Sequence, residues 1–143
     1  MNSKIYRRLD SYMDTVFTFG NGPNNPPTSL LFGPDFMFSK LYQLSPPEDL
    51  TLAVMLARPD PLFSDKSMMN AAVAVTDEKY GSVHRVYIVC DQDKTIPEDL
   101  QRWMIENNPT DEVKLLSGSD HMPMFSKPKE LCISLQEIAE KYP

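Results

Sequence analysis

The sequence has few of the residues that mark disulfide-rich, membrane-spanning or nucleic-acid-binding proteins. Its two cysteines are Cys90, in a strand-like run, and Cys132, in a helical pattern, and we expect both to be small buried apolar side chains rather than disulfide or metal partners. No apolar run approaches the ~20 residues that cross a membrane. Lysine and arginine number 14 against 20 acidic residues and are scattered, so no nucleic-acid partner is expected.

The beginning of the sequence also lacks the apolar segment of a signal peptide. Residues 1–8 are mostly polar or charged, which predicts a cytoplasmic protein with no membrane contact. The 143 residues, 41% of them apolar, are enough for one modest hydrophobic core. We therefore expect an ordinary globular chain.

The first half of the sequence combines short apolar runs with proline-rich turns. The elements we predict there are a weak helix over residues 1–13, a strand over 15–19, a turn-rich loop over 20–27, a strand over 28–32 that pairs back, a helix over 34–44 and a second helix over 47–57. The motif Ser45-Pro46-Pro47-Glu48 predicts a capping box for that second helix. Because the helix is apolar nearly all round, we expect it to be covered on two sides. Residues 64–80 suit either a helix or an extended segment.

The second half changes to an alternation of strands and helices. We predict a strand that begins at His84 and ends at Cys90, a helix that begins at the capping box Thr95-Ile96-Pro97-Glu98, a strand over 112–116 and a final helix over 128–142. The final helix has a single apolar stripe, which indicates docking on a sheet face. Two crossover strands do not make a complete parallel sheet, so the pattern predicts an α/β protein whose opening strands lie outside this sequence.

Polar residues follow each of these two strands. Asp93 comes just after the first, and His121 follows the second, in the loop Gly118-Ser119-Asp120-His121. The carboxyl ends of parallel strands meet at one edge, so an aspartate could hold the imidazole of a general base there. Spacing alone does not decide between Asp93 and Asp91, and a lone histidine in such a loop is more often held by local hydrogen bonds without catalytic use.

The other polar residues of the two loops have simpler interpretations. We interpret Asp120 as structural, and Gly118 as the residue that lets the loop turn. The set Asp91, Asp93, Asp120 and His121 lacks the alternate spacing of a hard-ion loop, so we expect no metal and no other cofactor.

A nucleophile is the missing part of this arrangement. None of the five glycines begins a G-x-S-x-G elbow, and no His-Gly oxyanion loop occurs. Without a nucleophile and preformed oxyanion donors, we predict that this chain alone does not turn over an ester.

Several segments from both halves of the chain form a recognisable set. They are Tyr80-Gly81-Ser82-Val83, Val86-Tyr87-Ile88-Val89-Cys90, Asp93 to Glu98, Gln101 to Ile105, Asp120 to Met124 and, in the first half, Leu31 to Pro34, Lys40 to Leu44, Pro47 to Leu50 and Arg58-Pro59. This set resembles the plant methylesterase family, the α/β-hydrolase group that includes salicylic-acid-binding methyl salicylate esterases, polyneuridine aldehyde esterase and the related hydroxynitrile lyases. The resemblance implies a mainly helical cap (lid) over residues 1–75. It also implies the last βαβα unit of the α/β-hydrolase core over residues 76–143.

The resemblance also implies roles for individual residues. Asp93, rather than Asp91, matches the aspartate of a Ser-His-Asp triad, and His121 matches its histidine. The implied substrate pocket is lined by Tyr12, Leu30, Phe32, Leu41, Tyr42, Leu62 and Met122. Tyr12 stands where salicylate-binding members have tryptophan, so the preferred acid stays open.

The implied function is a carboxylesterase that acts on methyl esters of small plant hormones: methyl salicylate, methyl jasmonate or methyl indole-acetate. One alternative is a fragment that binds a small aromatic acid such as salicylate without hydrolysing it. A second is a hydroxynitrile lyase, which Met122 disfavours because the lyases carry lysine directly after the histidine. The expected partners are the small ester or its acid and either a second copy of the chain or a missing N-terminal half.

Overall fold

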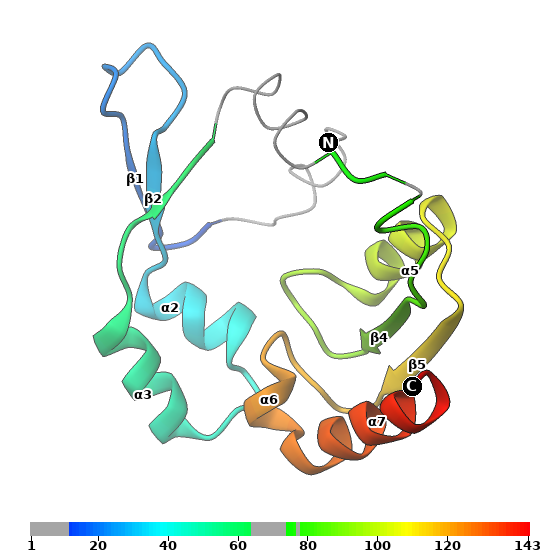
Figure 1. The fold of residues 1–143 in the computed structure, drawn as a ribbon. Coiled ribbons are helices and arrows are strands. Elements are labelled where there is room, and N and C mark those ends of the chain that lie inside the picture. The colour runs from blue at the N-terminus through cyan, green and yellow to red at the C-terminus, as the bar shows by residue number, and fades with distance from the viewer. Residues whose placement is uncertain (1–11, 64–73, 77) are drawn as a thin grey trace.

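The computed structural model describes residues 12–63, 74–76 and 78–143. Residues 1–11 of the helix predicted over 1–13 and most of the ambiguous segment 64–80 therefore lie outside the described residues. The boundary predicted between residues 75 and 76 is flanked by undescribed residues, so it stays a prediction. Figure 1 shows the short β-hairpin and its helices on one side of the molecule, and the two parallel strands with the later helices on the other.

The first half contains a small antiparallel sheet. Strand β1 (Val16–Thr18) pairs with β2 (Ser29–Leu31), which confirms that the second strand pairs back on the first. A two-residue strand, β3 (Asp60–Pro61), adds to the other side of β2. This third strand was not predicted from the sequence. A proline is tolerated at such a position because it lies on the edge of the sheet.

Helical segments lie between β2 and β3 along the chain and form a small core. The chain continues through α2 (Pro34–Phe36), the π-helical turn η1 (Met37–Leu41) and α3 (Pro47–Leu56). The buried cluster consists of Phe36, Met37, Leu41 and Tyr42. The predicted two-sided cover of α3 is wrong: none of its residues is fully buried, and Leu52 and Met55 are 55% and 71% exposed. Only the side that carries Leu50, Ala53 and Val54 packs on the buried cluster.

Both predicted capping boxes are also wrong. Helix α3 has Pro46 at its N-cap with no side-chain hydrogen bond, because the Ser45 hydroxyl donates to Asp120 instead. Pro97 takes the same position before α5, and the Thr95 hydroxyl donates to the carbonyl of Lys40. In each case, a hydroxyl that could cap its own helix bonds a residue from the other half of the chain.

The second half confirms the predicted βαβα unit. Strand β4 (Val86–Cys90) runs parallel to β5 (Glu112–Leu116), with Val86 opposite Glu112 and Cys90 opposite Leu116. Helix α5 (Glu98–Asn107) connects them. After β5 come a short helix not predicted from the sequence, α6 (Pro123–Ser126), and then α7 (Pro128–Lys141). This is the fold class expected from the alternation of strands and helices.

The buried Gln101 side chain of α5 fixes the end of β4. Its Oε1 accepts the N–H of Cys90 at 3.0 Å, and its Nε2 donates to the carbonyls of Cys90 and Ile96 at 2.8 and 2.7 Å. Buried backbone groups need such partners because they have lost water. The loop that begins after Cys90 is therefore anchored at its start.

Helix α7 covers the sheet only in part. None of its residues is fully buried, and Leu135, in the middle of the predicted docking stripe, is 52% exposed. Cys132 on this helix is exposed as well, so the expectation that both cysteines are buried is correct for Cys90 and wrong for Cys132. Both thiols are free. No helix in the described part of the chain has the length and apolar character needed to cross a membrane.

Candidate active site

An aspartate and a histidine meet where β4 and β5 end. The Nδ1 atom of His121 lies 2.8 Å from Oδ2 of Asp93. The Asp93 side chain is 7% exposed and that of His121 26%, so the pair is screened but still reachable. An ionised carboxylate can only accept hydrogen bonds, so Nδ1 carries the proton in this pair and Nε2 is left as the basic ring nitrogen.

Local hydrogen bonds orient the Asp93 carboxylate toward the histidine. Its Oδ1 accepts the backbone N–H groups of Thr95 and Ile96 at 2.7 and 2.8 Å, while Oδ2 faces His121. Asp91 instead accepts the N–H of Gly118 at 2.7 Å and the hydroxyl of Ser117 at 3.0 Å. The geometry thus pairs the histidine with Asp93, and Asp91 braces the loop that carries the histidine.

Asp120, next to the histidine, has no exposed surface. Its Oδ2 accepts the N–H of Leu44 and the hydroxyl of Ser45, both at 2.9 Å, and its Oδ1 accepts the N–H of Met122 at 2.9 Å. Gly118, two residues earlier, has a φ of +72°, which favours glycine and fits its predicted role in the turn. Asp120 therefore joins the histidine loop to the first half of the chain.

The carboxylates of these two loops are of the type that can also bind metal ions. Within the described ranges, no three His, Cys, Asp or Glu side chains are grouped so that they could hold a metal ion. The carboxylates of Asp91, Asp93 and Asp120 instead have N–H and O–H donors from the protein.

An open apolar pocket of about 640 Å³ adjoins the imidazole, in the size range of small-ligand sites. Four of the predicted substrate-binding residues line it together with His121, namely Phe32, Leu41, Tyr42 and Met122. The pocket also includes residues that sequence reasoning did not select: Leu31, Met37, Asp49, Leu52, Ala53, Leu56, Ala57, Arg58, Asp60, Thr95 and Phe125. Phe125 stacks on Tyr42 with ring centroids 5.9 Å apart.

The other three predicted substrate-binding residues, all in the described part of the chain, fall outside the lining of this pocket. Leu31 lines it where Leu30 was expected, because neighbouring residues of a strand point to opposite faces. Tyr12 packs against the buried cluster and meets Phe17 edge-on at 5.0 Å. The N–H of Leu62 donates to the carbonyl of Thr28, at the loop end of the β1–β2 hairpin.

Burial raises the pKa of two nearby groups. It raises the pKa of the Tyr42 hydroxyl, and the negative charges of Asp120 and Asp49 raise that pKa further. Burial also raises the pKa of the Cys90 thiol, and a hydrogen bond with Ser119 offsets only part of this. A thiol nucleophile needs a lowered pKa, so Cys90 is unsuited to that role.

The Asp93–His121 pair can take up a proton from a nucleophile and hold the resulting imidazolium against Asp93.

The sequence profile of the "Alpha/beta hydrolase family" matches residues 6–134, which is most of the chain. The chain belongs to this family. Methyl jasmonate esterase 1 of Vitis vinifera is 60% identical to this alpha/beta hydrolase chain over 136 residues, which cover 95% of the chain and 52% of that relative. Salicylic acid-binding protein 2 of Nicotiana tabacum is 50% identical over 93% of the chain and 50% of its own length. The chain thus spans about half the length of these plant relatives.

Solved structures of the family agree with this assignment. Tomato methylketone synthase I complexed with 2-tridecanone superposes on 99% of this chain with a TM-score of 0.89 and 42% identity. The match covers 54% of the tomato protein. Polyneuridine aldehyde esterase matches with a TM-score of 0.76 and 37% identity, over 97% of this chain and 51% of its own.

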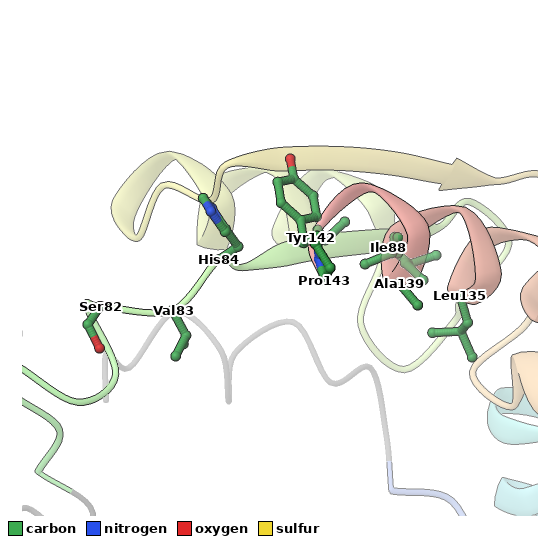
Figure 2. Close-up of a pocket in the computed structure, with 10 residues that line it drawn as sticks. Ser82, Val83, His84, Ile88, Leu135, Ala139, Tyr142 and Pro143 are labelled. Atoms are coloured by element: carbon green, nitrogen blue, oxygen red, sulfur yellow. The ribbon is translucent and has the colours of Figure 1, made fainter.

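A second open pocket lies on the side of the parallel sheet beside α7, and its lining shares no residue with the pocket at His121. Figure 2 shows Ile88 of β4 near Leu135 and Ala139 of α7, with Ser82 and Val83 at the end away from Leu135. Apolar side chains of the strand and the helix are left open to solvent here. No titratable pair like that of Asp93 and His121 is described among its lining residues.

Proposed function

We propose that this chain is the half of a carboxylesterase that carries the acid-base pair, and that the enzyme hydrolyses methyl esters of small plant acids such as jasmonate, salicylate or indole-acetate. The observation that carries the proposal is the Asp93–His121 hydrogen bond beside an apolar pocket. The 60% identity to a protein named methyl jasmonate esterase 1 supports the ester class.

In the proposed reaction, Nε2 of His121 removes the proton from a serine hydroxyl as its oxygen attacks the ester carbonyl. The imidazolium then gives this proton to the departing methoxide, and methanol leaves an acyl-enzyme. Water next attacks the acyl carbon with His121 again as base, and the serine and the free acid are released. Asp93 keeps Nδ1 protonated and stabilises the imidazolium in both steps.

The serine and the oxyanion donors would come from a segment outside these 143 residues. No G-x-S-x-G elbow occurs in the sequence, and the buried Cys90 has a raised pKa that keeps its thiol neutral. We infer that the chain alone does not turn over esters, because the nucleophile and the oxyanion donors together supply most of the rate enhancement.

The assay compares two proteins: the 143-residue chain alone, and the same chain joined to the N-terminal half of the Vitis relative. Methyl jasmonate, methyl salicylate and methyl indole-acetate are the substrates. We expect no turnover by the chain alone and turnover by the joined protein that His121→Ala abolishes. Turnover that survives His121→Ala, or a stable acyl-enzyme formed by the chain alone, would contradict the proposal.

A second candidate is a non-catalytic site for a small aromatic acid. The pocket at His121 supports it, together with the 50% identity to a relative named salicylic acid-binding protein 2. Thermal unfolding of the chain with and without salicylate distinguishes the two: a cooperative transition that salicylate raises favours binding by the chain itself. A hydroxynitrile lyase stays the least favoured alternative because Met122 follows the histidine.

A further inference from the structure

A six-residue segment of the first half, residues 40–45, bonds both loops that carry the acid-base pair. The carbonyl of Lys40 accepts the hydroxyl of Thr95 at 3.0 Å, and Nε2 of Gln43 donates to the carbonyl of Gln92 at 2.6 Å. These two contacts lie on either side of Asp93 in the sequence. Leu44 and Ser45 bond the side chain of Asp120, next to His121.

Among the groups that make these contacts, the Asp120 carboxylate is the most deeply buried. It has no exposed surface, and the structure gives it donors from Leu44, Ser45 and Met122. A buried charge is costly unless its oxygens are hydrogen bonded, so its two oxygens hold these donors firmly. One oxygen faces residues 44 and 45, and the other fixes the backbone directly after His121.

The same segment also forms part of the pocket wall. Leu41 and Tyr42 lie between the residues that make these bonds, and both line the pocket beside His121. A displacement of residues 40–45 would therefore move the pocket wall and the two loops together.

We propose that Asp120 is a positioning residue: it ties residues 40–45 to the histidine loop and thereby holds the His121 imidazole against Asp93. The catalytic meaning of this position rests on the proposed esterase function. The positioning itself does not, because it concerns a hydrogen bond that is present in the chain without substrate.

The test reads the two histidines of the 143-residue chain by 1H–15N NMR at about pH 8, where an ordinary histidine is neutral. His84 lies beside Asp111 and Tyr142 and is the internal reference. In Asp120→Ala we expect the Nδ1–H signal of His121 to weaken and its tautomer to shift, with His84 unchanged. Asp120→Asn keeps the volume and one acceptor oxygen, so its shift should be intermediate.

Asp14→Ala is the matched control. The Asp14 carboxylate also accepts two backbone N–H groups of the first half, from Asp35 and Phe36, both at 2.9 Å, but it does not bond the histidine loop. We expect this variant to lower the unfolding midpoint and to leave the His121 signals unchanged. Equal His121 shifts in Asp14→Ala and Asp120→Ala would overturn the proposal, because a general loss of stability would then explain both.

Ser45→Ala keeps the proposal testable if Asp120→Ala does not fold. It removes one donor of Asp120 and leaves the carboxylate in place. A smaller His121 shift in the same direction supports the proposal, and unchanged His121 signals overturn it. Because the readout needs no substrate, a failed esterase assay leaves this test unaffected.

Discussion

At the carboxyl ends of β4 and β5, side chains are buried and hydrogen bonded, whereas on the side of the sheet between β4 and α7 they lie open to solvent. Asp120 and Val89 have no exposed surface at the first place, and Leu135 is 52% exposed at the second. The difference separates two regions of the described part of the chain. The Asp93–His121 pair is held by buried, hydrogen-bonded neighbours, and the face of the sheet beside α7 is covered only in part.

The largest effect we expect concerns the Asp93–His121 pair at the carboxyl ends of β4 and β5. In the joined protein described above, Asp93→Asn should lower kcat for a methyl ester by about 10⁴-fold, because the amide favours the wrong tautomer of His121. Asp91→Asn is the control, since Asp91 braces Ser117 and Gly118 without contacting the imidazole. Steady-state kinetics measure both variants, and equal losses would contradict the assignment of Asp93.

Denaturant unfolding of the chain tests the contrast in burial. Phe36→Ala should lower the free energy of unfolding by about 3–5 kcal/mol, because the ring is 3% exposed within the buried cluster. Leu135→Ala on the open side should change it by no more than about 0.5 kcal/mol. If Leu135→Ala costs as much as Phe36→Ala, the open side is covered in solution and the contrast is wrong.

The contact between Gln101 and the end of β4 should have an intermediate effect. Gln101→Ala leaves the N–H and C=O of Cys90 without their side-chain partner and should cost about 2–3 kcal/mol. Arg102→Ala, one residue along α5, removes only an exposed pair with Glu98 and should cost less than about 0.5 kcal/mol. The same unfolding measurement compares them, and a similar cost for both would show that the Gln101 contacts are not needed.

The smallest effect concerns the two thiols. Iodoacetamide should modify the exposed Cys132 quickly and the buried Cys90 slowly, as mass spectrometry of the intact chain would show. Burial raises the pKa of the Cys90 thiol in the folded chain, so the same thiol loses its proton at a lower pH when the chain is unfolded. The contribution of Cys90 to stability is thus complete below the ordinary thiol pKa and falls as pH rises through the folded pKa. Rapid modification of Cys90 in the folded chain would contradict its burial.

Much of this architecture was predictable from local patterns. The parallel strands, their crossover helix and the final helix followed from apolar runs and helical periodicity. The pairing of His121 with Asp93 followed from the resemblance, whereas spacing alone left Asp91 open. Four of the residues implied for the substrate pocket line the pocket at His121, but Leu31 rather than Leu30 lines it, because the facing side of a short strand depends on its register.

The failures have a common physical cause. Ser45 and Thr95 have the sequence context of helix caps, yet their hydroxyls bond Asp120 and Lys40 across the molecule. Contacts between distant segments outweigh local preference there, and a single sequence does not reveal them. The partial cover of α3 and α7 was missed for a related reason: an apolar stripe shows which face can pack but not what is present to pack on it.

The Gln101 side chain also limits how the sheet can grow. Its amide already accepts the N–H of Cys90 and donates to the carbonyl of the same residue. A further strand that added alongside β4 could not use the N–H of Cys90, so its backbone pairing would have to end within Val86–Val89. Backbone pairing on that edge of β4 would therefore end before Cys90 and before the loop that carries Asp93.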